Sequence, residues 1–296
     1  MSTFAKCTSV TPLCPVEATT YGYYPDLGGN VALCVVFGLV LIAQLIIGFS
    51  SRILGYSIVI ACGSLLECVG YIGRLKMHHN PWDMSGFQMQ IVCLIIGPSF
   101  TAAGVYLTLK HFVYHNGPEY SRIKPAQYPW IFVCCDAGSI ILQAAGGGVA
   151  GAAGKKNPDL LNTGNNIMIA GIAFQVATMT ICGLLSIDYV IRLLRHRNHR
   201  HDEPNTQKYN KMNKRAHLFH IVVGFAYVTI LIRSIYRIPE MAGGWGNEMM
   251  RNEKEFLLLD GLMIALASIA LTLFHPAFFY PIIKGEKVVM EEHIQL

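Results

Sequence analysis

Polar and ionisable residues in this sequence stand inside long apolar stretches, at spacings that place several of them on one helical face. Arg233, Arg237 and Glu240 are separated by four and three residues, so a helix would align them along one stripe. Two guanidinium groups one turn apart suit a phosphate or carboxylate, whereas a carboxylate suits a cationic amine. An ionisable group at membrane depth is costly and marks a candidate functional site. The residues that we select as candidates for substrate binding and translocation are Glu67, Tyr71, Arg74, Asp136, Gln143, Gln175, Arg233, Tyr236, Arg237, Glu240, Glu255, Asp260 and His275.

The elements that carry these residues have a strongly apolar composition. Of the 296 residues, 53% are hydrophobic and 14% are charged, and the mean hydropathy is +0.41. A soluble domain has about 25% charged residues, so this chain lacks the side chains for a water-facing surface. The composition therefore excludes an ordinary cytosolic enzyme, a nucleic-acid-binding domain and a disordered chain.

Seven stretches are long enough to cross a membrane as helices, because a hydrocarbon core of about 30 Å needs about 20 residues. They are residues 29–49, 54–74, 87–113, 128–150, 164–189, 216–237 and 256–279. The sequence therefore predicts an all-α, polytopic membrane protein in which residues 29–283 form one seven-helix transmembrane bundle. Residues 1–28 and 284–296 remain as terminal tails.

Lysine and arginine residues are distributed unevenly between the two sides of these spans. With the N-terminus outside, the cytoplasmic segments hold 14 of the 23 Lys and Arg residues, the external segments hold 8, and Arg233 lies within a span. Because cytoplasmic loops of membrane proteins are rich in basic residues, this distribution predicts an extracellular N-terminal tail and a cytoplasmic C-terminal tail.

This topology also predicts the depth of the polar residues. The charged candidates other than Asp136 fall in the outer half of the bundle, whereas Asp136, Gln143 and Gln175 lie nearer its midplane. His275 lies towards the cytoplasm. The layout predicts a polar cavity open to the outer leaflet, with a narrower polar path beneath it. The alternative is that the charged residues form ion pairs that only hold the helices together, because a lone buried charge would be intolerable.

Signatures of cofactors are absent or misplaced. A Gly-x-Gly-x-x-Gly pattern at 146–151 has the spacing of a dinucleotide fingerprint, but it ends a membrane span and follows no strand. We interpret its glycines, and the Gly147/Gly151 spacing in particular, as positions where helices approach closely. The sequence has no phosphate loop, and it predicts no nucleotide and no other cofactor.

Two further chemistries involve histidine and cysteine. His220, His275 and Asp136 are weak candidates for zinc ligands, because they stand on separate spans without the close spacing of a metal site. Cys7 and Cys14 lie in the predicted external tail, where a disulfide between them can form.

A series of motifs along the chain resembles one known family. They include YGYYPDLGGN from Tyr21, ECVGYIGR from Glu67, DAGSIILQAAGGG from Asp136, ILIRSIYRIPE followed by GGWGNEMMRNEKEFLLLD, and HPAFFYP from His275. Together they resemble the fungal lipid-translocating exporters, the RTA-like family named for resistance to aminocholesterol. The resemblance implies a seven-span fungal protein, usually of the plasma membrane, linked to sphingoid long-chain bases, to toxic amphiphiles and, in one branch, to porphyrins. The resemblance carries the polar motif residues of that family onto all of the candidates selected above except Tyr71 and Tyr236.

The function that we predict is ATP-independent translocation or export of lipids or amphiphiles, of the sphingoid long-chain base or phospholipid class. Such an activity would confer resistance to toxic amphiphiles. Two alternatives stay open, which are a seven-helix lipid sensor or receptor and a zinc-dependent intramembrane lipid hydrolase. The expected partners are membrane lipids or amphiphilic small molecules and a second copy of the chain, with no nucleic acid. The expected location is the plasma membrane, with internal membranes as the alternative.

Overall fold

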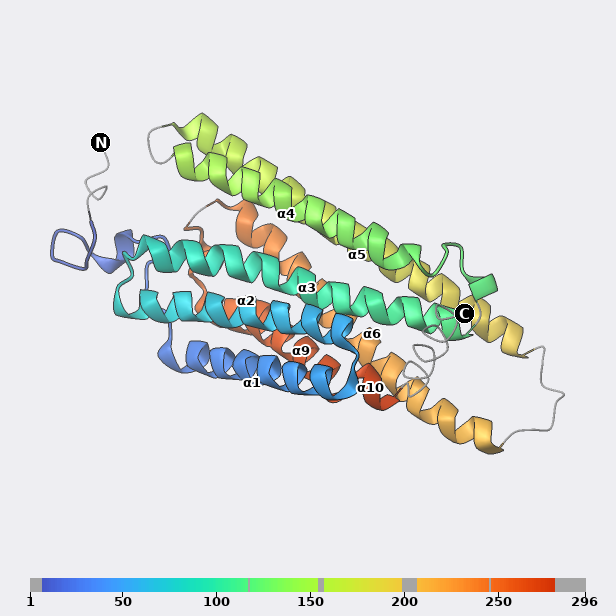
Figure 1. The fold of residues 1–296 in the computed structure, drawn as a ribbon. Coiled ribbons are helices and arrows are strands. Elements are labelled where there is room, and N and C mark those ends of the chain that lie inside the picture. Colours follow the sequence, from blue (N-terminus) through green and yellow to red (C-terminus); the bar gives the residue numbers. More distant parts are fainter. Residues whose placement is uncertain (1–6, 117, 154–156, 199–206, 245, 280–296) are drawn as a thin grey trace, which may run out of the picture.

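The computed structural model describes residues 7–116, 118–153, 157–198, 207–244 and 246–279. In this part of the chain seven helical segments are long and apolar enough to cross a membrane, which confirms the predicted all-α, seven-span fold (Figure 1). Six of them are single helices, namely α1 (Leu27–Ser51), α2 (Leu54–His79), α3 (Met84–Asn116), α4 (Gln127–Ala153), α5 (Pro158–Asn198) and α6 (Gln207–Ala242).

The seventh span is a composite of three segments. Following a short helix, α7 (Glu248–Arg251), it consists of α8 (Glu253–Glu255), a π-helix η3 (Phe256–Leu262) and α9 (Met263–Leu273). A further short helix, α10 (Pro276–Phe279), follows it. A π-helix inside a span is rare and frequently marks a functional position.

Several helices run past the ranges predicted from hydropathy. The helix α5 has 41 residues and α6 has 36, so both continue into polar sequence near residues 198 and 207. Pro98 and Pro239 lie inside α3 and α6 without ending them. Residues 280–283, the end of the predicted transmembrane bundle, and the tail 284–296 lie outside the described residues.

The helices pack mainly with their neighbours in sequence. The helix α2 lies between α1 and α3, while α4 and α5 form a hairpin that contacts α3 and α6, and α9 packs against α6 and α1 (Figure 1). Glycines bring α4 and α5 together, because a Cβ at Gly146 would lie 2.5 Å from the Met168 nitrogen and one at Gly164 would lie 2.4 Å from the Ala150 nitrogen. The close approach is therefore at Gly146 and not at Gly147, whose Cβ would meet nothing within 4 Å.

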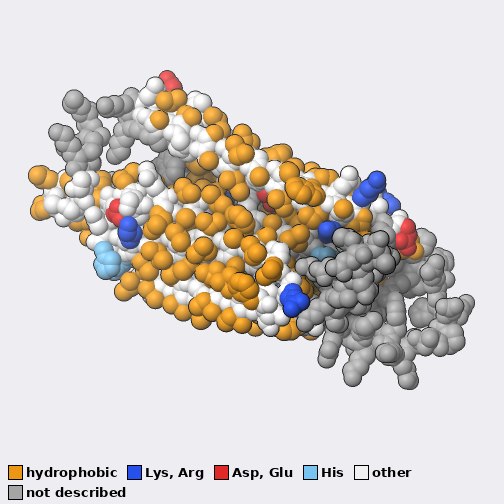
Figure 2. All heavy atoms as spheres, in the orientation of Figure 1, with side chains coloured by type: hydrophobic (Ala, Val, Ile, Leu, Met, Phe, Trp, Pro, Cys, Tyr) orange, Lys and Arg blue, Asp and Glu red, His pale blue; other side chains and the backbone are white. Residues whose placement is uncertain are grey.

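The surface matches an integral membrane protein. On the face shown in Figure 2, hydrophobic side chains cover the middle of the bundle, and coloured charged side chains lie mainly towards its two ends. Large apolar residues such as Leu39, Ile46 and Phe49 of α1 are exposed. A contiguous exposed apolar band of this kind is compatible with lipid, since water would penalise it.

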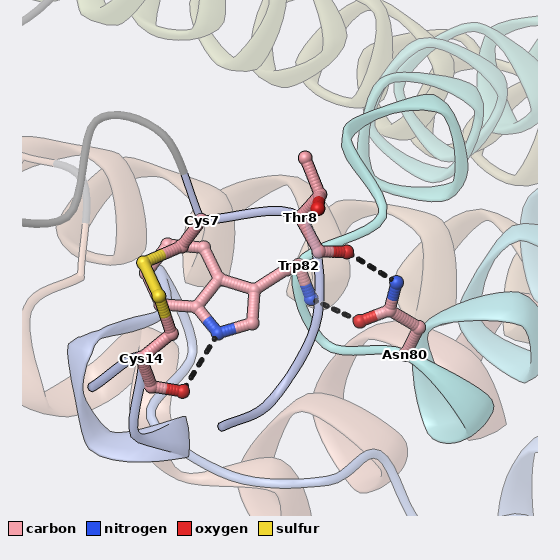
Figure 3. Close-up of a disulfide and its surroundings, with 5 residues drawn as sticks. All are labelled: Cys7, Thr8, Cys14, Asn80 and Trp82. Atoms are coloured by element: carbon pink, nitrogen blue, oxygen red, sulfur yellow. Dashed lines mark hydrogen bonds between the residues drawn. A yellow bond between two sulfur atoms is a disulfide. The ribbon is translucent and has the colours of Figure 1, made fainter. Parts of the chain in front are cut away.

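The N-terminal segment packs on one end of the bundle, which we call the tail end. A disulfide joins Cys7 and Cys14, and the loop that it closes contacts the α2–α3 connection (Figure 3). The Trp82 Nε1 donates to the Cys14 carbonyl at 3.3 Å, and the Asn80 side chain donates to the Thr8 carbonyl at 2.8 Å. These contacts hold the tail over the ends of α2 and α3.

Candidate functional site

Arg74 of α2 is the centre of a buried polar network at the tail end. Its side chain is fully buried, and its guanidinium lies 2.7 Å from the Glu253 carboxylate of α8. It also donates to Asn30 Oδ1 of α1 at 2.8 Å and lies 4.2 Å from the centre of the Phe256 ring. A buried arginine needs both a counter-charge and hydrogen-bond acceptors, and α1 and α8 supply them.

The N-terminal segment forms the cover of this network. The Tyr23 hydroxyl accepts a hydrogen bond from Arg74 at 3.2 Å, and the Tyr21 hydroxyl accepts one from the Gln90 side chain of α3 at 2.7 Å. Burial raises the pKa of Tyr21 to about 12, against the opposing effect of the nearby Arg74 charge. Both tyrosines therefore contact the network as neutral phenols at physiological pH.

Two more ion pairs lie on the stripe of α6 that the sequence predicted. The Arg233 Nε lies 3.0 Å from Asp260 Oδ1, and the Arg237 Nη1 lies 2.7 Å from Glu240 Oε2. Arg233 also donates to the Leu94 carbonyl of α3. Asp260 belongs to the π-helix η3, so this irregular turn carries the carboxylate that meets Arg233. All four charged side chains are at most 5% exposed.

Glu67 of α2 differs from these residues because its carboxylate has no hydrogen-bond partner. It is 1% exposed, and neither oxygen accepts a hydrogen bond within the described structure. Its charged neighbours are Arg233, Asp260 and Arg237. It packs against Gly97 of α3, where an added Cβ would lie 2.9 Å from Oε1. Buried polar groups are normally hydrogen-bonded, so this carboxylate has unused binding capacity.

The same region holds other buried polar atoms without partners. They are the hydroxyls of Tyr71 and Tyr236 and the Nη2 of Arg237. The Arg233 Nε and Asp260 Oδ1 atoms, although 3.0 Å apart as an ion pair, also lack hydrogen-bond geometry. Across the described residues of this region, three arginines face five buried or half-buried carboxylates. Glu67 and Glu255 make no ion pair among the described residues, and Glu67 is the fully buried one of the two. We call Glu67, Tyr71, Arg233, Tyr236, Arg237, Glu240 and Asp260 the charged cluster. The predicted opening of a cavity to the outer leaflet stays a prediction, since these side chains are buried in this conformation.

A second polar layer lies deeper along α3, α4 and α5. The Gln143 side chain of α4 donates to Gln175 Oε1 of α5 at 3.3 Å, and Gln175 Nε2 donates to the Ser99 hydroxyl of α3 at 3.0 Å. The structure thus brings together two glutamines that the sequence placed on separate spans.

Asp136 of α4 forms a third layer. Its side chain is 3% exposed, and neither carboxylate oxygen accepts a hydrogen bond in the part of the chain that the structure describes. The Tyr106 hydroxyl of α3 is the polar group that interacts with this carboxylate, although the pair lacks the geometry of a full hydrogen bond.

The remaining predicted residues are His275 and Glu255, of which Glu255 lies near Tyr236 of the charged cluster. His275 lies at the opposite end of the bundle, where its Nε2 is 2.9 Å from the Ser57 hydroxyl. Glu255 is half-buried and makes no ion pair among the described residues. His220 packs on the Phe112 ring, with 3.9 Å between ring centres. No group of three His, Cys, Asp or Glu side chains in the described ranges could hold one metal ion, so His220, His275 and Asp136 are not brought together.

Sequence reasoning missed the residues that complete the Arg74 network. Glu253 was passed over in favour of Glu255, two residues further along the same motif. Asn30, Gln90 and Tyr21 were also missed. Asn30 and Tyr21 lie within the motif YGYYPDLGGN, but neither was selected as a candidate. Their polar character inside or beside apolar spans was the signal that could have found them.

The fold and these layers define an integral membrane protein of seven helices with a buried charged cluster near one end. The chain belongs to the RTA1-like family, since a family described as "RTA1 like protein" matches residues 60–282. A Saccharomyces cerevisiae protein named "Sphingoid long-chain base transporter RSB1" is 32% identical over 283 residues, covering 88% of this chain and 74% of the relative. "Protein RTA1" of the same yeast is 24% identical, covering 83% and 81% of the two chains.

A third yeast relative has a different printed activity. "Protoporphyrin uptake protein 1" is 26% identical over 209 residues, covering 70% of this chain and 64% of the relative. No solved structure matches the chain. The family therefore supports transport of a lipid or amphiphile as the general activity, and the predicted family is confirmed. The orientation of the termini, a homodimer and the plasma-membrane location stay predictions.

Proposed function

We propose that this protein moves a sphingoid long-chain base across the plasma membrane without ATP, and that the activity protects cells from toxic amphiphiles. A sphingoid base has one acyl-like chain and a headgroup with a cationic amine and hydroxyls. The printed name of the RSB1 relative, which the chain covers over 74% of its length, supports this substrate class. The charged cluster is the proposed headgroup site.

The unpartnered carboxylate of Glu67 is the observation that carries the proposal. An ammonium group has three donors, and Glu67 offers two acceptor oxygens with the Tyr71 hydroxyl one helical turn away. The free Arg237 Nη2 and the Tyr236 hydroxyl could bond the hydroxyls of the headgroup. Each of these atoms is buried, so a ligand would satisfy groups that otherwise lack partners.

The charge balance of the site favours a cation over an anion. Arg74, Arg233 and Arg237 each have a carboxylate within 3.0 Å, and Glu67 has no such partner. An anionic phosphate or porphyrin carboxylate would have to displace a protein carboxylate from one of these arginines. An amine would add the charge that the site lacks, which is why we place the amine of the base at Glu67.

Transport from this site requires a second conformation, because the cluster is closed to water in this structure. Alternating exposure of a site inside the bundle is the general solution for carriers without a nucleotide site. The ion pairs of α6 with η3 and of α2 with α8 are the contacts that an opening movement would separate.

The test uses purified protein in liposomes with three fluorescent lipids of equal chain length. These are a free sphingoid base, its N-acetylated form and a phospholipid, and quenching from outside reports their sidedness. We expect wild-type protein to move the free base and to leave the neutral N-acetylated form at the rate of empty liposomes. Glu67→Gln should slow movement of the free base about 10- to 100-fold, the loss of one charged hydrogen-bonded contact.

The matched control is Asp188→Asn, which removes a carboxylate from the exposed Arg122–Asp188 pair away from the cluster. It should move the base at the wild-type rate. Equal rates for the free and N-acetylated bases, or full activity of Glu67→Gln, would contradict the proposed headgroup site. Saturable binding of the base without movement would instead favour the sensor.

A further inference from the structure

Asp136 has the features of an ion-binding group outside the charged cluster. It is buried on α4, both of its oxygens lack hydrogen-bond partners, and no Lys or Arg among the described residues pairs with it. The titratable groups that face it are Tyr106 of α3, Cys182 of α5 and Tyr227 of α6. None of these groups carries a positive charge, so a carboxylate here requires a bound cation or a proton.

The surroundings of Asp136 suit a proton better than a metal ion. Hard cations take six or more oxygen ligands, and this site offers a carboxylate and two tyrosine hydroxyls. The Tyr227 hydroxyl is already bonded to the Met179 carbonyl, and the neighbouring Ser139 hydroxyl donates to the Cys135 carbonyl. A single proton neutralises the carboxylate without further ligands.

The charged cluster, the Ser99–Gln175–Gln143 layer and Asp136 follow one another along the bundle, and we call this series of layers the polar path. On α3, Ser99 and Tyr106 are seven residues apart, and on the antiparallel α4, Gln143 and Asp136 are also seven apart. Seven residues are two helical turns, about 10 Å. The Ser99–Gln175–Gln143 layer therefore lies between Asp136 and Gly97, the residue against which Glu67 packs.

We propose that Asp136 binds a proton that crosses the bundle in exchange for the lipid cation held at Glu67. One proton moves inward for each cationic base that moves outward, so the net charge on the polar path stays constant through the cycle. This coupling rests on the proposed function. The proposal gives a role to Asp136, the second buried carboxylate without a partner in the described spans, which takes no part in binding the headgroup.

The first experiment detects the proton without any lipid. Infrared difference spectra of the full protein in lipid bilayers, recorded between neutral and alkaline pH, report the carbonyl stretch of a protonated carboxylic acid. In the Glu67→Gln background, which removes the other buried carboxylate without a partner, we expect a band that Asp136→Asn removes. Asp188→Asn and Tyr106→Phe should retain the band in this background, and Tyr106→Phe should shift its position. A band that persists in this background with Asp136→Asn would overturn the proposal.

The second experiment measures coupling in liposomes with the membrane potential clamped to zero by potassium and valinomycin. The probe is an N-trimethylated sphingoid base, whose permanent charge prevents pH-driven partition of a neutral amine. Because this probe keeps the positive charge but has no N–H donor, its downhill movement at equal pH is measured first, to show that the headgroup site accepts it. Wild-type protein should accumulate it up to about tenfold per pH unit on the acidic side, the ratio for exchange of one proton. Asp136→Asn should abolish the accumulation, and Asp188→Asn should preserve it.

The outcomes separate this proposal from the proposed function. Downhill movement of the probe that ignores the pH gradient would overturn the coupling and leave the transport function standing. No movement of any base by the wild-type protein would contradict the transport function and the coupling together, and the infrared band would still decide whether Asp136 holds a proton.

Discussion

Replacing Glu253 by alanine would leave Arg74 as a buried cation without its counter-charge. The two side chains are 2.7 Å apart, with 0% and 15% of their surfaces exposed. The same carboxylate also accepts hydrogen bonds from the Asp26 nitrogen and the Asn30 side chain. Three elements, α1, α2 and α8, therefore lose a shared contact in one substitution.

The expected decrease in the free energy of unfolding follows from the burial of the Arg74–Glu253 pair. Removing one partner of a buried ion pair costs about 3–5 kcal/mol. Arg74 would keep Asn30 and the face of Phe256, and Glu253 is not fully buried, so we expect about 3 kcal/mol, the lower end. That loss raises the unfolding equilibrium constant about 100-fold. Glu255→Ala is the control, because this neighbouring carboxylate is half-buried without an ion pair among the described residues, and it should cost about 0.5 kcal/mol or less.

The assay is reversible unfolding in lipid–detergent micelles by sodium dodecyl sulfate, followed by circular dichroism. A double variant, Arg74→Met with Glu253→Ala, removes both charges and should be less destabilised than the sum of the single changes. Equal unfolding free energies for Glu253→Ala and Glu255→Ala would refute the reasoning, as would additive effects in the double variant.

Two further predictions concern other contacts of the fold. Gly146→Ala should destabilise the α4–α5 hairpin by about 1–3 kcal/mol in the same unfolding assay, because the added Cβ would collide with the Met168 backbone. The control Gly147→Ala places its Cβ in open space, so it should be neutral or stabilising by up to about 1 kcal/mol. Reducing the Cys7–Cys14 disulfide frees a loop with a sequence separation of 7, worth about 2–3 kcal/mol of chain entropy. The amide of Cys14, which donates to the Thr11 carbonyl at 2.9 Å, should then exchange hydrogen faster by mass spectrometry, and unchanged exchange would show that the tail is held by other contacts.

The spans could be predicted because the hydrocarbon thickness fixes the length of an apolar helix. The tight connection of α1 to α2 was visible in the short polar segment at 50–52, where Arg52 adopts a left-handed conformation with φ of 60°. The far ends of α5 and α6 could not be predicted in this way, because a helix can continue into water where hydropathy carries no signal. Helix termini are set there by local capping and packing.

The site could be predicted as a set of residues but not as a set of partners. The stripe spacing placed Arg233, Arg237 and Glu240 together correctly on one helix, and the structure adds Asp260 from a different span. Arg74 pairs with Glu253 and not with Glu255 because of where α8 meets α1 and α2. This tertiary contact leaves no periodic pattern in the sequence from which it could be predicted. Glu67 stood out in the sequence as a polar residue, but its lack of a partner is visible only once the neighbours are placed.

The π-helix η3 also constrains how the seventh span can change in length. Each residue added to or removed from a helix rotates everything beyond it by about 100° around the axis. A deletion within residues 257–259 that converted η3 to a regular α-helix would turn Glu253 away from Arg74 while Asp260 stayed opposite Arg233. The extra residue of this turn therefore sets the rotational phase between two ion pairs, and relatives that keep both pairs should have no insertions or deletions between the positions of Glu253 and Asp260.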